Sequence, residues 1–139
     1  MDIFDSMKIS SSALAAQRSR LNVVSSNLAN IETTRTPEGG PYQKRDVVFR
    51  SAPLGFSGVL DRAVQGVEVA EIRANTDPPK LVHDPSHPDA DAQGYVALPN
   101  ISLMEEMVDL MTASRSYDAN VTVIKSAKRM ALKALEIGK

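Results

Sequence analysis

The chain is 139 residues long, which is the size of one domain or of one domain with an insertion. Its net charge is -1 and aromatic residues make up 4% of it, so it lacks both the basic excess that holds a nucleic-acid backbone and the rings of a base-stacking surface. The absence of cysteine excludes a disulfide framework and a thiol site. No run of about 18 apolar residues predicts a membrane-spanning helix, and the first residues lack the pattern of a cleaved secretory signal.

The first arm, residues 1–36, contains no glycine or proline and predicts a helix that ends near Asn30. Asp2 is a candidate N-cap for this helix. A neighbouring apolar row is interrupted by Ser10 and Gln17. Large apolar residues recur every seven positions, which is typical of a helix-packing seam and also compatible with an ordinary core stripe: Met7, Leu14, Leu21 and Leu28.

The middle, residues 37–99, holds every glycine and proline except Gly138 and predicts a small β-rich insertion. Three stretches favour short strands, namely 44–49, 67–72 and 94–99, and the stretch 59–64 is ambiguous. Residues 77–91 carry four prolines and predict an extended loop. With so few large apolar residues, we expect this insertion to lean on the two arms or on neighbouring molecules.

The last arm predicts a single long helix from Ser102 to Ile137, because it too lacks glycine and proline. Ser102 and Glu105 have the spacing of a capping box, and Gly138 is a candidate C′ residue. Acidic residues precede basic ones along the helix, in the order that complements a helix dipole.

An apolar seam runs along this predicted helix in alternating steps of four and three, and it is broken at Ser114 and Lys128. Its apolar members are Leu103, Met107, Leu110, Tyr117, Val121, Ile124, Ala131 and Leu135. A second row of Met104, Val108 and Met111 widens the apolar face of the first half, which therefore predicts more than one neighbour. An amphipathic helix on an ordinary small domain remains an alternative.

Taken together, the arms predict a mainly α fold with a small, irregular β insertion. The long N- and C-terminal helices are expected to pair as an antiparallel, coiled-coil-like hairpin. The predicted domain organisation joins residues 1–36 with 100–139 as the helical part and leaves 37–99 as the insertion.

The middle also carries a cluster of candidate metal ligands within nine residues: His83, Asp84, His87, Asp89 and Asp91. The favoured interpretation is a proline-stiffened loop whose Asp and Ser side chains bond to nearby backbone and whose histidines face solvent, because no helix aligns the two histidines. No nucleophile, phosphate-binding or dinucleotide motif is present. We therefore predict no enzyme and no catalytic, cofactor-binding or metal residues, with a metal-binding enzyme centred on His83 and His87 as the weaker alternative.

The segment Ser25–Thr34 resembles the signature that ends the first helix of bacterial flagellar basal-body rod and hook proteins. The signature residues in this chain are Asn27, Leu28, Ala29, Asn30 and Thr33. The resemblance extends nearly end to end and is to the proximal rod members of that family, through the segments 35–42, 84–91, 94–96, 99–100, 105–108 and 114–121.

The resemblance implies a structural subunit of the proximal rod, which polymerises into a helical tube that transmits torque and encloses the export channel. It further implies type III export without a cleaved signal peptide to the periplasmic rod, and no cofactor. The implied partners are further copies, other rod subunits, and basal-body ring and export-gate proteins. A coiled-coil adaptor of another assembly is the alternative.

Under this hypothesis the seams carry packing within and between subunits, and an isolated chain leaves part of them uncovered. The residues expected to carry this packing are Met7, Leu14, Leu21, Leu28, Leu110, Tyr117, Val121, Ile124 and Leu135. The proline-rich loop and the stretch 44–49 are expected to form outer contacts.

Overall fold

The computed structural model of the protein describes residues 3–53 and 65–137. These residues form two long helices and two small antiparallel sheets, so the predicted mainly α fold with a small β part is confirmed. The elements follow one another as α1 (Ile3–Ala29), β1 (Arg45–Pro53), β2 (Gln65–Ala74), β3 (Lys80–His83), β4 (Tyr95–Leu98) and α2 (Leu103–Ile137). In the described part of the chain, neither helix is both long enough and apolar enough to cross a membrane.

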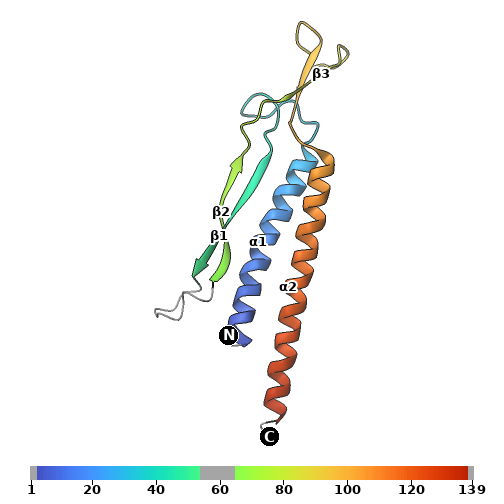
Figure 1. The fold of residues 1–139 in the computed structure, drawn as a ribbon. Coiled ribbons are helices and arrows are strands. Elements are labelled where there is room, and N and C mark those ends of the chain that lie inside the picture. The colour runs from blue at the N-terminus through green and yellow to red at the C-terminus, as the bar shows by residue number, and fades with distance from the viewer. Residues whose placement is uncertain (1–2, 54–64, 138–139) are drawn as a thin grey trace.

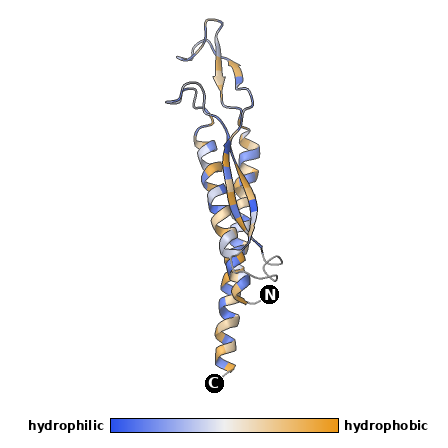
Figure 2. Ribbon diagram, turned by 90° about the vertical axis from the view of Figure 1, so that its left-hand side faces the viewer, coloured by the Kyte–Doolittle hydropathy of each residue, from blue (hydrophilic) through white to orange (hydrophobic). Residues whose placement is uncertain are grey.

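The elements form three layers in which α1 is the central one. Figures 1 and 2 show α1 and α2 side by side and antiparallel, with the β1–β2 hairpin along the other side of α1. The β3–β4 hairpin lies beyond the end at which α1 finishes and α2 begins. Because α2 packs mainly against α1, most of its surface faces away from the chain.

Helix α1 ends at Ala29, close to the predicted end at Asn30. The turn that follows is closed by the Asn30 N–H, which donates to the Ser26 carbonyl at 3.1 Å, and by the Thr33 N–H, which donates to the Asn30 carbonyl at 3.1 Å. The threonines beyond this turn are poor helix formers, so the chain leaves the helix here. The predicted N-cap, Asp2, lies outside the described residues.

Helix α2 begins at Leu103, directly after its predicted cap. The Ser102 Oγ accepts a hydrogen bond from the Glu105 N–H at 3.5 Å, which is the first half of a capping box. With 35 residues against the 27 of α1, α2 is longer by about 12 Å and runs past the start of α1 (Figure 1). Gly138, the candidate C′ residue, lies outside the described part.

The strands confirm all three predicted stretches and add one. β1 pairs with β2 from Arg45 opposite Ala74 to Pro53 opposite Gln65, with a bulge between Val48 and Phe49. The prediction of an extended loop at 77–91 was wrong in part, because residues 80–83 form β3. Prolines flank this strand without entering it, and pairing with β4 satisfies its backbone groups. The ambiguous stretch 59–64 lies outside the described residues.

The hydrophobic core is a narrow line of small side chains rather than a large cluster. Among the described residues, the buried apolar side chains are Ala16, Val23, Val24, Val96, Ala113 and Ala127. Alanine and valine let helix backbones approach closely but bury little area each. The larger apolar residues of both helices therefore keep part of their surface in solvent.

Candidate functional site

The predicted packing residues lie on both helices but at different depths. Met7, Leu14, Leu21 and Leu28 on α1 are half-buried, and so are Leu110, Tyr117, Val121 and Ile124 on α2. Leu135 is 70% exposed, since it lies on the part of α2 that extends past α1. The structure thus brings most of these residues to the helix pair, and their role in assembly stays a prediction.

The deepest line of α2 lies one residue before the positions at which the predicted seam was broken. Ala113 is 0% exposed and Ala127 is 2% exposed, whereas Ser114 and Lys128 face solvent. The two apparent breaks are therefore outside the helix interface. On α1, Ser10 is buried at 5% exposure although it interrupts an apolar row, because a small serine fits where the helices approach closely.

A buried polar network, here called the polar junction, closes the end where α1, β1 and α2 meet. It consists of the side chains of Asn27, Tyr42, Lys44 and Glu106 and the backbone of Arg45. Asn27 and Glu106 are each 1% exposed, and they are the largest fully buried side chains of the described chain. A buried polar group is costly unless it is hydrogen-bonded, so the partners of these two decide whether the junction holds.

Asn27 ties the end of α1 to the start of β1. Its Nδ2 donates to the Arg45 carbonyl at 2.8 Å, and the Arg45 N–H donates to its Oδ1 at 3.0 Å. This pair of bonds reproduces what a neighbouring strand would offer the Arg45 backbone. The Tyr42 hydroxyl donates to the same Oδ1 at 3.2 Å, so the linker is held as well. The signature position 27 therefore needs a side chain that both donates and accepts hydrogen bonds, as the amide of Asn27 does.

Glu106 ties the start of α2 to the same point. Its Oε2 accepts from Asn27 Nδ2 at 3.1 Å, and its Oε1 lies 3.0 Å from Lys44 Nζ. Burial by itself would lower the pKa of Lys44, but the hydrogen bond and negative charge of Glu106 outweigh it and the pKa is raised. The buried carboxylate is thus paired, which is the condition for keeping a charge in such a place.

Sequence reasoning did not identify the junction. It counts Glu106 among the acids that complement the helix dipole, and it interprets Lys44 as a solvated or pairing charge with no partner named. One signal was present, because Glu106, Ala113 and Ala127 fall at intervals of seven and fourteen on one helix face. The partners are 79 and 62 positions from Glu106 in the chain, which no local pattern reveals.

Two of the acidic side chains of the proline-rich loop, Asp84 and Asp91, accept bonds from nearby backbone, as the favoured interpretation predicted. Asp84 accepts from the Ser86 hydroxyl at 2.6 Å and from the Ser86 N–H at 3.0 Å, and these bonds lower its pKa. Asp91 accepts from the Tyr95 N–H at 2.9 Å and the Gln93 N–H at 2.8 Å, which lower its pKa in the same way.

The remaining members of the candidate metal cluster point to different partners. Asp89 accepts from the Thr34 hydroxyl at 2.7 Å and lies 3.2 Å from the Arg35 guanidinium, which links the loop to the chain after α1. His87 Nδ1 accepts from the Asp89 N–H at 3.1 Å, and the His83 ring meets Tyr95 edge-on at 5.1 Å. Within residues 3–53 and 65–137, no three His, Asp or Glu side chains are grouped to hold a metal ion.

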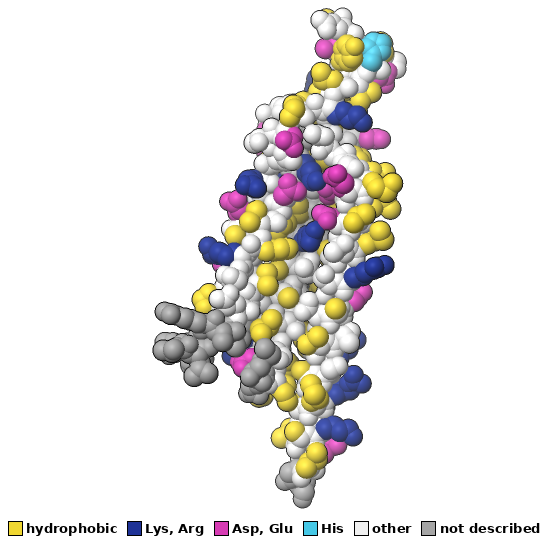
Figure 3. Space-filling model, in the orientation of Figure 1, with side chains coloured by type: hydrophobic (Ala, Val, Ile, Leu, Met, Phe, Trp, Pro, Cys, Tyr) yellow, Lys and Arg dark blue, Asp and Glu magenta, His cyan; other side chains and the backbone are white. Residues whose placement is uncertain are grey.

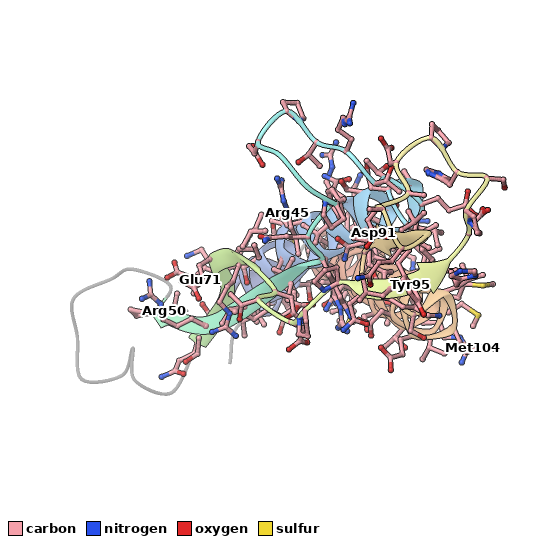
Figure 4. All side chains as sticks on the ribbon, turned by 90° about the horizontal axis from the view of Figure 1, so that it is seen from above. Arg45, Arg50, Glu71, Asp91, Tyr95 and Met104 are labelled. Carbon is pink, nitrogen blue, oxygen red and sulfur yellow. The ribbon has the colours of Figure 1, made fainter. Side chains whose placement is uncertain are left out.

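The outer face of α2 carries the exposed apolar surface that the second predicted row anticipated. Met104 is 74% exposed, and Figure 4 places it on the side of the molecule away from Arg50 and Glu71 of the β1–β2 hairpin. Figure 3 shows the apolar side chains along the upper part of α2 and basic ones along its lower part. The exposed large apolar residues of α2 are Leu103, Met104, Met107, Val108, Met111, Val123, Met130, Leu132, Leu135 and Ile137.

Chemically, the arrangement favours binding of other proteins. The buried charge pair of Lys44 and Glu106 holds elements together, and the acids of the loop are held by backbone and side-chain donors nearby. Exposed apolar rows on one face of a helix are typical of a surface that another helix covers. The candidate functional site is therefore the outer face of α2, positioned by the polar junction.

Comparison with known proteins gives matches at both ends of the chain. Residues 7–35 match the family model described as "Flagella basal body rod protein", and residues 92–137 match the one described as "Flagellar basal body rod FlgEFG protein C-terminal". The two matches contain the signature segment and all of α2.

Curated relatives match over nearly their whole length. The chain is 46% identical to the flagellar basal-body rod protein FlgC of Bacillus subtilis, with 100% of both chains covered. It is 45% identical to FlgC of Borreliella burgdorferi, covering 99% of this chain and 98% of the relative. It is 46% identical to FlgC of Salmonella typhimurium, covering 99% and 97%.

Proposed function

The chain belongs to the family of flagellar basal-body rod proteins FlgC, and we propose that it acts by polymerising with other rod subunits into a helical tube. As a member of this family it is a structural subunit of the rod and not an enzyme. In the proposed tube, the proximal rod transmits torque and encloses the export channel. The observation that carries the proposal is the open apolar face of α2, which the described residues of the chain do not cover.

The exposed apolar face of α2 supports assembly, because covering it removes apolar surface from water and is therefore favourable in free energy. Each large apolar side chain removed from water contributes about 1.5–3 kcal/mol. Helix α2 exposes two neighbouring apolar rows in its first half and further apolar residues at its end. Neighbouring subunits along and around a tube would cover these rows at several places at once. This matches the expectation that the first half of α2 needs more than one neighbour.

We further propose that α1 and α2 pair in the manner of an antiparallel coiled coil. Their side-by-side course and the spacing of Glu106, Ala113 and Ala127 support this pairing. In this proposal, residues 1–36 with 100–139 form the inner helical part and 37–99 the outer insertion. The predicted packing residues would then divide between the helix pair and the subunit contacts, with Leu135 wholly on the subunit side.

The proposed location is the periplasmic rod, reached by type III export without a cleaved signal peptide. The names of the relatives support the basal body as the place of assembly. The proposed partners are further copies, the other rod subunits, and the ring and export-gate proteins at the base. No cofactor is proposed for this role.

Complementation of a flagellated strain that lacks its own rod subunit tests the proposal. Replacing half-buried Ile124 by Asp places a charge on the helix pair, and we expect loss of swimming and loss of the chain from purified basal bodies. Ile72→Asp, at an exposed position on β2 rather than on α2, is the control and should retain swimming. Motile Ile124→Asp cells with normal incorporation, or a wild-type chain that never enters basal bodies, would overturn the proposal.

A further inference from the structure

We propose that the last turns of α2 in one copy bind beside the first turns of α2 in a second copy, as a head-to-tail contact that rests on the proposed polymeric function. One of the two contact surfaces is the acidic groove, which is lined by Lys44, Met104, Glu105, Val108 and Asp109. The other contact surface is the basic tail, residues 125–137 of α2. Both lie on the same chain, so a second copy supplies the missing half of each.

The acidic groove offers an apolar wall and one carboxylate without an ion pair. Met104 is 74% exposed and Val108 is 52% exposed along its outer edge. Asp109 is paired with Arg20 at 2.8 Å, and Lys44 is paired with buried Glu106 at 3.0 Å. Among the ion pairs of the described residues, none uses Glu105, whose side chain is exposed.

The basic tail offers the opposite charge and further apolar surface. Leu132, Leu135 and Ile137 are 51%, 70% and 86% exposed. Lys128 and Lys133 face solvent and take part in no ion pair of the described chain. Figure 3 shows basic side chains along this lower part of α2.

The tail also continues an interface that the chain has already begun. Ala127 is buried against α1, but α1 starts only at Ile3, close to this level of α2. Beyond it, the face of α2 that packs on α1 has no helix beside it in the described chain (Figure 1). Residues 125–137 extend for about 18 Å and carry four basic residues against one acid, Glu136, whereas 103–111 extend for about 12 Å. The tail is therefore long enough to cover the groove, and the two surfaces have opposite net charge.

Helix dipoles favour the same arrangement. When the tail of one copy lies beside the groove of another, the negative end of one helix approaches the positive end of the next. Because the two surfaces are different, the contact is heterologous and leaves a free groove at one end and a free tail at the other. Such a contact repeats along a polymer instead of closing into a two-fold dimer.

Sedimentation velocity of the purified full-length chain tests the contact. An area this small predicts weak association, with a Kd of about 100 µM or weaker, and we expect it to weaken as salt rises from about 50 to about 500 mM. Glu105→Lys or Lys133→Glu should each weaken association about fivefold, and the two changes in one chain should restore it. Association that neither exchange alters would overturn the charge pairing.

A mixing experiment separates this contact from a symmetric one. Met104→Asp blocks the groove and Leu135→Asp blocks the tail, both at exposed positions that leave the fold intact. Each variant alone should stay monomeric, whereas an equimolar mixture should form dimers and stop there. Ile72→Asp, a change at a 51% exposed position on β2, should associate like the wild type. Failure of the mixture to dimerise would overturn the proposal.

The proposed function is judged separately, by incorporation into basal bodies. If Glu105→Lys and Lys133→Glu chains associate normally in solution and enter basal bodies, only this contact is wrong. If the wild-type chain never enters basal bodies, the polymeric function itself fails. The two outcomes are therefore distinguishable in the same set of strains.

Discussion

The two helices of this protein have similar patterns and very different surroundings. Helix α1 packs between α2 on one side and the β1–β2 hairpin on the other, and Phe4 is its exposed large apolar side chain in the described structure. Helix α2 packs mainly against α1 and exposes large apolar residues from Leu103 to Ile137. The width of an amphipathic pattern thus indicates how many neighbouring elements a helix needs. Within the described residues, these neighbours are present for α1 but not for the outer face of α2.

The two ends of the helix pair differ in the same way. At the upper end, α1, β1 and α2 are held together by the polar junction around Asn27 and Glu106. At the lower end, α2 continues alone past the start of α1. The polar junction therefore holds α2 against α1 and β1 at the upper end. The following predictions test the difference between this held end and the open surface of α2.

The largest expected effect is at the polar junction. Glu106→Ala leaves Lys44 without its partner and removes one of the Asn27 bonds. We expect the free energy of unfolding to fall by about 3 kcal/mol, since one partner of a buried pair is lost. Urea denaturation measures it, with exposed Glu105→Ala as the matched control that should change by less than about 0.5 kcal/mol. Equal effects of the two changes would show that the junction does not hold the helices.

An intermediate effect is expected at the helix interface. Ala113→Leu inserts a larger side chain where exposure is 0%, and we expect about 2 kcal/mol of destabilisation from overpacking. Ser114→Leu, one residue further and exposed, is the control and should be nearly neutral. Thermal unfolding followed by circular dichroism compares them. If Ser114→Leu destabilised the protein more than Ala113→Leu, then Ser114 rather than Ala113 would lie at the helix interface, in the row that the sequence pattern indicated.

The smallest effect is expected in the β3–β4 hairpin at low pH. The folded-state pKa of Asp84 and Asp91 is lowered by bonds from Ser86 and Tyr95, so their stabilising contribution is complete above the ordinary carboxyl pKa of about 3.9. It is lost as pH falls through the lowered values. Protection of the Ser86 and Tyr95 amides, measured relative to the intrinsic exchange rate at each pH, should therefore decrease below about pH 4, while amides of α1 stay protected. Unchanged protection of these two amides would contradict the role given to the carboxylates.

Local patterns were sufficient for both helices, for three of the four described strands and for the family. The clustering of glycine and proline in 37–99 left two arms that could only be helices, and α1 and α2 end close to where the sequence predicted. The row of Met104, Val108 and Met111 lies outside the seam that packs on one helix, so the sequence predicted that a second neighbour covers it. In the structure these three side chains are exposed. The signature at Asn27–Thr33 pointed to the rod family without any structure.

Tertiary packing decided what spacing alone left open. A periodic row identifies the apolar side of a helix, but the partner determines which residues lie deepest, so Ala113 and Ala127 replaced Ser114 and Lys128 at the interface. Residues 80–83 became a strand only because β4 offered a partner. Glu106 became buried only because Asn27 and Lys44, far away in the chain, supplied its hydrogen bonds and countercharge. Helices arise from neighbours in sequence, whereas burial of a charge requires partners that only the folded chain brings together.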